Sequence, residues 1–229
     1  MPDLSPDAWT AIALSFKVAA MATLWGVPVS ILLALILARG RFPGKTLFDG
    51  IIHLPLVLPP VVTGYALLLL LGRKGPVGAF LDQQFGIVFS FRWTGAVLAA
   101  VVMSLPIIVR AIRLSIEAVD AHLEQASGSL GAGPVATFFL VTLPLSLPGI
   151  LVGATLGFAK ALGEFGATIT FVSNIPGETR TIASAIYTAS QSPEGDGEAL
   201  MLSVIAAGIG LAALVASEII ARRLRRTSS

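Results

Sequence analysis

Residues 119–144 hold a run of carboxylate, amide, imidazole and hydroxyl side chains between two very apolar segments. These side chains belong to Asp120, His122, Glu124, Gln125, Ser127 and Ser129. Groups of this polarity are costly to place in hydrocarbon, so the run indicates a loop outside the membrane core. Carboxylates and amides on such a loop suit contacts with a partner protein, and we expect docking rather than catalysis here.

The same stretch has the pattern of a helix, a glycine elbow and a second helix. Apolar residues recur at alternating spacings of three and four, which puts them on one helix face. That face holds Ile116, Val119, Leu123, Ala126 and Leu130, and another holds Glu117, Asp120 and Glu124. Asp120 suits an N-cap, Gly131 a C-terminal stop, and Gly133-Pro134 a turn into the next helix. We expect a surface hairpin that buries its apolar face in a partner's groove and makes contacts with its acidic face.

A second polar pair, Lys160 and Glu164, lies in an otherwise apolar segment. Their spacing of four places them on one helix face. Charges at membrane depth are expensive and usually face a bundle interior or a watery cavity. The pair is either structural, each charge neutralising the other, or it lines the path or gate of a solute. The spacing leaves both hypotheses open.

The whole chain has the composition of a membrane protein. Of its 229 residues 55% are apolar and only 12% are charged, about half the charged share of a soluble domain. There is no cysteine, and the net charge of +2 is too small to indicate nucleic acid. Charge-free runs of about 20 residues mark membrane spans. They predict an all-α integral membrane protein with five spans, at about 18–38, 51–72, 93–109, 143–171 and 199–217.

Five spans place the termini on opposite sides of the membrane, and the basic residues decide which side is which. With the C-terminus inside, the cytoplasmic set is Arg39, Arg41, Lys45, Arg110, Arg113, Arg222, Arg223, Arg225 and Arg226. The positive-inside rule therefore predicts the N-terminus outside and the hairpin 119–144 in the cytoplasm. We also expect short helices within the outer segment 73–92 and at about 181–189.

The hairpin sequence carries a resemblance to a known family. Glu124-Gln125-Ala126, Gly131 and then Val141-Thr142-Leu143-Pro144 resemble the "EAA" signature of membrane subunits of bacterial ABC importers. Glutamine stands at the family's second position, and valine stands for the isoleucine two residues before Leu-Pro. The resemblance extends over a single domain at 9–222 and implies the type I importer permease fold. It also implies that the hairpin is the coupling helix, docking on an ATPase through Asp120, Glu124, Gln125, Ala126, Gly131, Leu143 and Pro144.

Other stretches bear on the solute. Residues 163–167, Gly-Glu-Phe-Gly-Ala, are similar to a string in permeases of oxyanion importers. Residues 53–72 and 171–182 resemble the molybdate importer permeases more than the sulfate ones, so the resemblance implies molybdate, with tungstate, sulfate or thiosulfate as alternatives. A dianion needs polar groups on its way through, and the candidates for its path or gate are Thr63, Ser104, Lys160, Glu164, Thr168 and Thr170.

The resemblance also implies the partners. These are a second copy of the chain, two ATPase subunits that bind ATP-Mg, and an extracytoplasmic molybdate-binding protein. The location implied is the bacterial cytoplasmic (inner) membrane, with no catalytic residue, metal or cofactor in this subunit. An integral-membrane enzyme is the alternative from another class. It is disfavoured because no HExxH motif is present and the histidines, His53 and His122, fall in separate contexts.

Overall fold

The computed structural model describes residues 4–227, and the side chains of Ser217 and of residues 220–227 are not described. The arginines predicted to mark the cytoplasmic C-terminus, Arg222, Arg223, Arg225 and Arg226, therefore lie outside the described side chains. Within residues 4–227 all regular structure is helical. The elements are α1 (Pro6–Arg39), α2 (Lys45–Val57), α3 (Pro60–Leu71), α4 (Pro76–Phe85), α5 (Trp93–Glu117), α6 (Ala121–Ser129), α7 (Pro134–Thr137), the π-helix η1 (Phe138–Thr142), α8 (Leu143–Leu162), α9 (Gly166–Val172), α10 (Ile182–Ser190) and α11 (Asp196–Thr227).

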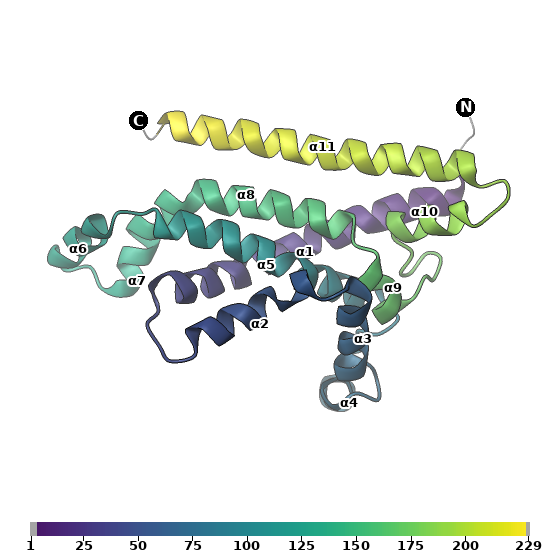
Figure 1. Ribbon diagram of the computed structural model, residues 1–229, viewed down its shortest axis with the longest axis horizontal. Helices are drawn as coiled ribbons and strands as arrows, with labels where there is room; N and C mark the ends of the chain where they lie inside the picture. The colour runs from purple at the N-terminus through teal and green to yellow at the C-terminus, as the bar shows by residue number, and fades with distance from the viewer. Residues whose placement is uncertain (1–3, 228–229) are drawn as a thin grey trace.

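The long helices α1, α5 and α8 form the bundle around which the rest is arranged (Figure 1). Glycines spaced by four on α8 let its backbone approach α5 closely. A Cβ at Gly149 would lie 2.2 Å from the Ser115 Cβ, and one at Gly157 would lie 2.5 Å from the Ile108 Cδ1. The packing of these helices therefore depends on the absence of side chains along one stripe of α8.

Most of the predicted spans lie inside longer helices. Continuous helices that are long and apolar enough to cross a membrane run over Pro6–Arg39, Trp93–Glu117, Pro134–Leu162 and Asp196–Ala216. The predicted spans 18–38, 93–109 and 199–217 coincide with the first, second and last of these. The helices are longer than the predicted spans because charged residues do not end them: Lys17 lies within α1 and Arg110 within α5.

The helix predicted over 51–72 is broken in two. Helices α2 and α3 meet at a bend of 115°, so the chain has four continuous candidate spans, or five if the bent pair counts as one. Leu58 is extended (ψ 143°) because the residue before a proline is pushed out of the α region. Pro59 and Pro60 also lack the N–H groups that would continue the ladder. The two prolines therefore interrupt the continuous helix predicted over 51–72.

The helix predicted over 143–171 is displaced. It begins earlier, at Pro134, and ends at Leu162, after which residues 163–165 separate it from α9. Lys160 therefore sits in the last turn of α8, whereas Glu164 follows the end of that helix. The expectation that both side chains lie on one helix face is wrong, because the helix stops between them.

The bundle has two distinct ends (Figure 1). At one end lie the α6–α7 hairpin and the C-terminal part of α11, and at the other lie the start of α1, α10 and the start of α11. The short helices predicted in the outer segments are present. Helix α4 lies within 73–92, and α10 begins after Thr181, whose hydroxyl accepts a hydrogen bond from the Ser184 N–H.

Candidate functional site

The hairpin between α5 and α8 has the local structure that its sequence predicts. The Asp120 carboxylate accepts a hydrogen bond from the His122 N–H at 2.9 Å and caps α6. Gly131 follows α6 with a φ of +90°, a left-handed conformation that other residues adopt only with strain. Pro134 then occupies the first turn of α7. The helix, the glycine elbow and the second helix are therefore all found.

The apolar face of the hairpin differs from the prediction. The helix is interrupted at residues 118–120, and Asp120 caps a new helix whose register is separate from that of α5. Ile116 in the last turn of α5 and Val119 within this break are buried. Leu123 and Leu130 lie beyond it and are 48% and 89% exposed. A continuous stripe from Ile116 to Leu130 was wrong, because a spacing pattern does not reveal a cap inside it.

Glu124 ties the hairpin to the bundle. Its Oε1 accepts hydrogen bonds from the Arg39 Nη2 at 3.0 Å and from the Thr142 Oγ1 at 2.7 Å. The same Arg39 nitrogen also donates to the carbonyls of Ile116 (3.1 Å) and Val119 (3.3 Å) at the end of α5. One guanidinium thus joins the end of α1, the end of α5 and helix α6. Ser127 and Thr137 add a hydroxyl contact at 3.1 Å between α6 and α7.

The acidic residues of the hairpin do not form a free acidic face. Glu117 pairs with Arg113 at 2.8 Å, Asp120 is engaged as the α6 cap, and Glu124 is engaged by Arg39. The exposed residues of the hairpin include Gln125, Ala126 and the apolar Leu123, Leu130 and Val135, beside the polar His122. Of the remaining predicted coupling residues, Leu143 packs on the core that contains Ile108, and Pro144 is exposed in the first turn of α8.

Arg39 and Thr142 were missed as site residues. Arg39 was interpreted only as a topology signal, and Thr142 only as part of the Val-Thr-Leu-Pro string. An arginine at the end of the first predicted span, with a glutamate in a loop on the same predicted side of the membrane, was the available signal. Choosing the correct partner requires the fold, because Arg41, Arg110 and Arg113 also follow predicted spans on the same side of the membrane.

Lys160 and Glu164 form an ion pair at the opposite half of the bundle. The Lys160 Nζ lies 2.7 Å from the Glu164 Oε2, and Glu164 is only 2% exposed. The other carboxylate oxygen, Oε1, accepts a hydrogen bond from the Ala167 N–H at 3.0 Å in the first turn of α9. Both Glu164 oxygens are thus used to join α8 to α9, which favours the structural hypothesis for this pair.

The hydroxyl residues predicted along the solute path are spread over several helices. Ser104 donates to the Ala100 carbonyl (2.7 Å) and Thr170 to the Gly166 carbonyl (2.8 Å), so each bonds its own helix. Thr63 is 7% exposed, and its buried hydroxyl has no hydrogen-bond partner within the described part of the chain. Thr168 is 1% exposed on α9, which packs on α3 so closely that a Cβ at Gly64 would lie 2.4 Å from the Ala167 carbonyl oxygen. Their role on a path stays a prediction.

The fold and the hairpin define a class of transport protein. Residues 26–226 match the family described as binding-protein-dependent transport system inner membrane component. The chain belongs to this family, and the resemblance seen in its hairpin sequence is confirmed.

Individual relatives are similar over nearly the whole chain. The molybdenum transport system permease protein ModB of Escherichia coli (strain K12) is 56% identical over 219 residues, with 96% of each chain covered. The ModB protein of Haemophilus influenzae is 52% identical over 217 residues, with 95% of each chain covered. A solved bacterial alginate ABC transporter, in complex with an alginate pentasaccharide-bound periplasmic protein, has a TM-score of 0.75 at 19% identity. That alignment covers 96% of this chain and 80% of the other. This structural likeness supports the fold and carries no information on the solute.

Proposed function

We propose that this chain is the membrane-spanning subunit of an ATP-driven importer of molybdate, embedded in the bacterial inner membrane. The observation that supports molybdate as the solute is the identity of 56% over 96% of both chains with a molybdenum permease. At this identity the segments that resemble molybdate permeases, 53–72 and 171–182, are part of a likeness that spans the whole molecule. The subunit moves the solute by alternating access and leaves ATP hydrolysis to a separate subunit.

The α6–α7 hairpin is the proposed contact with the ATPase. It projects from one end of the bundle (Figure 1). It carries exposed apolar residues that a docked partner would cover. Arg39 and Thr142 hold Glu124, so movement of the docked hairpin is transmitted to α1, α5 and α8. In this scheme the apolar surface and Gln125 dock on the ATPase, and Glu124 links the hairpin to the spans.

The assembly proposed is a homodimer with two ATPase subunits and an extracytoplasmic molybdate-binding protein. A protomer with four or five spans is too small to enclose a path alone, and a second copy supplies the other wall. The hairpin and the C-terminal part of α11 share one end of the bundle. We assign that end to the cytoplasm and the N-terminus to the outside, in line with the positive-inside rule.

The test is reconstituted uptake. The chain is inserted into vesicles with its ATPase and binding protein, and accumulation of radiolabelled molybdate is followed with and without ATP. We expect ATP-dependent uptake that excess tungstate reduces and that excess sulfate or thiosulfate leaves largely unchanged. ATP-dependent uptake of sulfate in preference to molybdate would contradict the solute assignment. Absence of ATP-dependent uptake of any of these oxyanions would contradict the transport proposal.

A further inference from the structure

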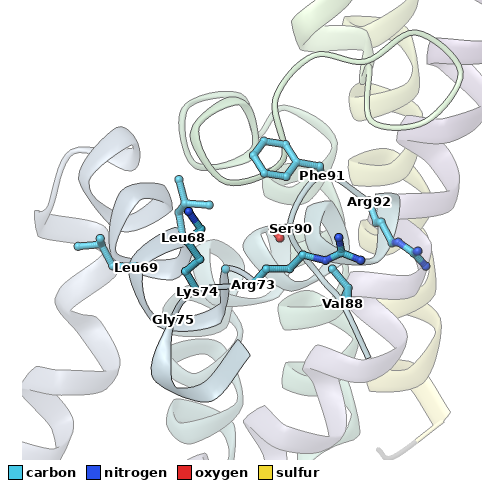
Figure 2. A pocket seen from close by; sticks show the side chains of 10 residues that line it. Leu68, Leu69, Arg73, Lys74, Gly75, Val88, Ser90, Phe91 and Arg92 are labelled. Atoms are coloured by element: carbon cyan, nitrogen blue, oxygen red, sulfur yellow. The ribbon is translucent and has the colours of Figure 1, made fainter. Parts of the chain in front are cut away.

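A basic pocket lies at the turn between α3 and α4, beside the start of α5. It has a volume of about 590 Å³ and is lined by Arg73, Lys74, Arg92, the buried Ser90 and the apolar Leu68, Leu69, Val88 and Phe91. Figure 2 shows Arg73 extending across this pocket toward Val88 and Arg92, with Lys74 at the side of Leu68. The cations come from segments about twenty residues apart in the sequence, so the fold brings them together.

Two of the three cations of this pocket have no ion pair among the described residues. Lys74 and Arg92 have no carboxylate within ion-pair distance among the described residues. Arg73 pairs with Asp82 at 3.6 Å, and the Arg73 side chain is 67% exposed.

Other cations toward the same end of the bundle are occupied. Lys17 stacks on the Trp93 ring, Lys160 pairs with Glu164, and Arg180 bonds Asn174 at 3.0 Å. These cations therefore have partners within the protein, whereas Lys74 and Arg92 of the pocket are available to a ligand.

Helix ends add to the positive potential at this place. Gly75 and Arg92, which both line the pocket, are the N-caps of α4 and α5. The N-terminal end of a helix carries a partial positive charge that favours anions. One carboxylate competes there, because the Glu178 Oε1 lies 3.5 Å from the Trp93 N–H on the α5 start. That contact is long and leaves the Arg92 side chain unpaired.

The backbone beside Arg92 is held in an unusual conformation. Phe91 has a φ of +59°, which is a rare conformation for a bulky residue. Such strained positions persist where the surrounding structure enforces them, and they cluster at binding sites. Here the strained residue forms part of the pocket wall, and its backbone conformation sets the direction in which the next side chain, that of Arg92, projects.

We propose that this pocket binds a tetrahedral oxyanion group, either the free dianion that the importer carries or the phosphate of a lipid headgroup. The first source rests on the proposed function and makes the pocket a receiving site near the outer mouth of the path. The apolar lining supports either source, because it lowers the local dielectric and strengthens the attraction between the cations and the oxyanion. Arg73 and Arg92 supply planar forks suited to oxyanions, and Lys74 supplies a point charge.

The experiment compares the full-length chain, copurified with its ATPase in nonionic detergent, with the double variant Lys74→Gln/Arg92→Gln. Binding of radiolabelled molybdate is measured by equilibrium dialysis, and retention of phosphatidylglycerol by native mass spectrometry. Arg41→Gln is the matched control, since it removes an exposed cation outside the pocket. We expect the double variant to lose about tenfold in affinity for one of the two probes, and the control to change little.

The outcomes separate the sources. A loss of molybdate binding alone identifies the solute site, and a loss of phosphatidylglycerol alone identifies a lipid site of the same chemistry. Equal binding of both probes by the wild type and the double variant would overturn the proposal. If vesicles with the wild-type chain still import molybdate in that case, the pocket assignment fails while the proposed function stands.

Discussion

The hairpin and the basic pocket use charge in opposite ways. Glu117 at the end of α5 and Asp120 and Glu124 in the hairpin each have a partner within the protein, and the exposed residues of the hairpin include apolar side chains and the Gln125 amide. In the pocket Lys74 and Arg92 are left without a carboxylate partner among the described residues, although carboxylates occur nearby in the chain. The charged side chains of the hairpin thus stabilise its conformation, whereas Lys74 and Arg92 of the pocket have no ion pair among the described residues.

This difference follows from what each region has to meet. A hairpin that transmits movement must be rigid relative to the spans, and charge-assisted hydrogen bonds supply that rigidity. A site for a small anion must offer unneutralised positive charge to replace the water that the anion loses. Changes that loosen the hairpin should therefore affect coupling, and changes in the pocket should affect binding.

Breaking the hairpin at its elbow should have the largest effect. In Gly131→Val a β-branched side chain is forced to a φ of +90°, at a cost of about 1–3 kcal/mol. A coupling energy of this size corresponds to roughly 5–150-fold. We expect ATP-driven molybdate uptake to fall by about tenfold or more while ATP hydrolysis continues and the protein remains in the membrane. The measurement is the number of ATP molecules hydrolysed per molybdate imported.

Two controls isolate the backbone conformation at the elbow. No atom lies within 4 Å of a Cβ built at either Gly131 or Gly128, so space does not distinguish the two glycines. Gly128 lies inside α6 without a positive φ, and Gly128→Ala should keep uptake near the wild-type value. Gly131→Asn should lie between, because asparagine tolerates the left-handed region. Normal uptake by Gly131→Val would remove the elbow from the coupling scheme.

Splitting the buried ion pair should have the next largest effect. Lys160→Met leaves the Glu164 carboxylate, 2% exposed, without its cation, and we expect a loss of about 1–2 kcal/mol in the free energy of unfolding. The value is at the lower end because the Lys160 side chain is 30% exposed. The double variant Lys160→Met/Glu164→Gln should lose less than the single variant. Thermal unfolding in detergent measures the stability of the single and the double variant. A loss in the double variant as large as or larger than in the single variant would argue for separate roles of the two residues.

Releasing the hairpin from the bundle should have the smallest effect of the three. Arg39→Gln removes the guanidinium that joins Glu124 to the end of α5, and both partners are partly exposed. An interaction of about 0.5–1 kcal/mol is expected for such a pair. Uptake should fall about two- to fivefold, with more ATP hydrolysed per molybdate. Glu124→Gln combined with Arg39→Gln should lose less than the sum of the single losses, and strict additivity would show that the contact does not act in coupling.

The sequence predicted the local structure of the hairpin because capping residues act within a few positions. Asp120, Gly131 and Pro134 each impose their conformation on the adjacent backbone, and the structure has each of them in the predicted role. Hydropathy predicted long apolar helices for the same reason, since it depends on consecutive residues.

The parts that failed depend on contacts between distant residues. The engagement of Glu124 by Arg39 joins positions 85 residues apart, and the burial of both Glu164 oxygens depends on where α8 ends. The break at Pro59-Pro60 was visible as composition, but its bend of 115° depends on what the neighbouring helices accommodate. The basic pocket was missed because the fold is needed to bring Arg92 beside Arg73 and Lys74.

Two-sided thiol labelling tests the central claim most directly. The chain has no cysteine, so single replacements can be labelled without background. Leu130→Cys marks the hairpin, where the native side chain is 89% exposed, and Lys74→Cys marks the pocket. In sealed vesicles of known orientation a membrane-impermeant thiol reagent should reach Leu130→Cys only from the cytoplasmic side and Lys74→Cys only from the outside. Labelling of Leu130→Cys from the outside alone would contradict the account, because the hairpin could then meet no ATPase.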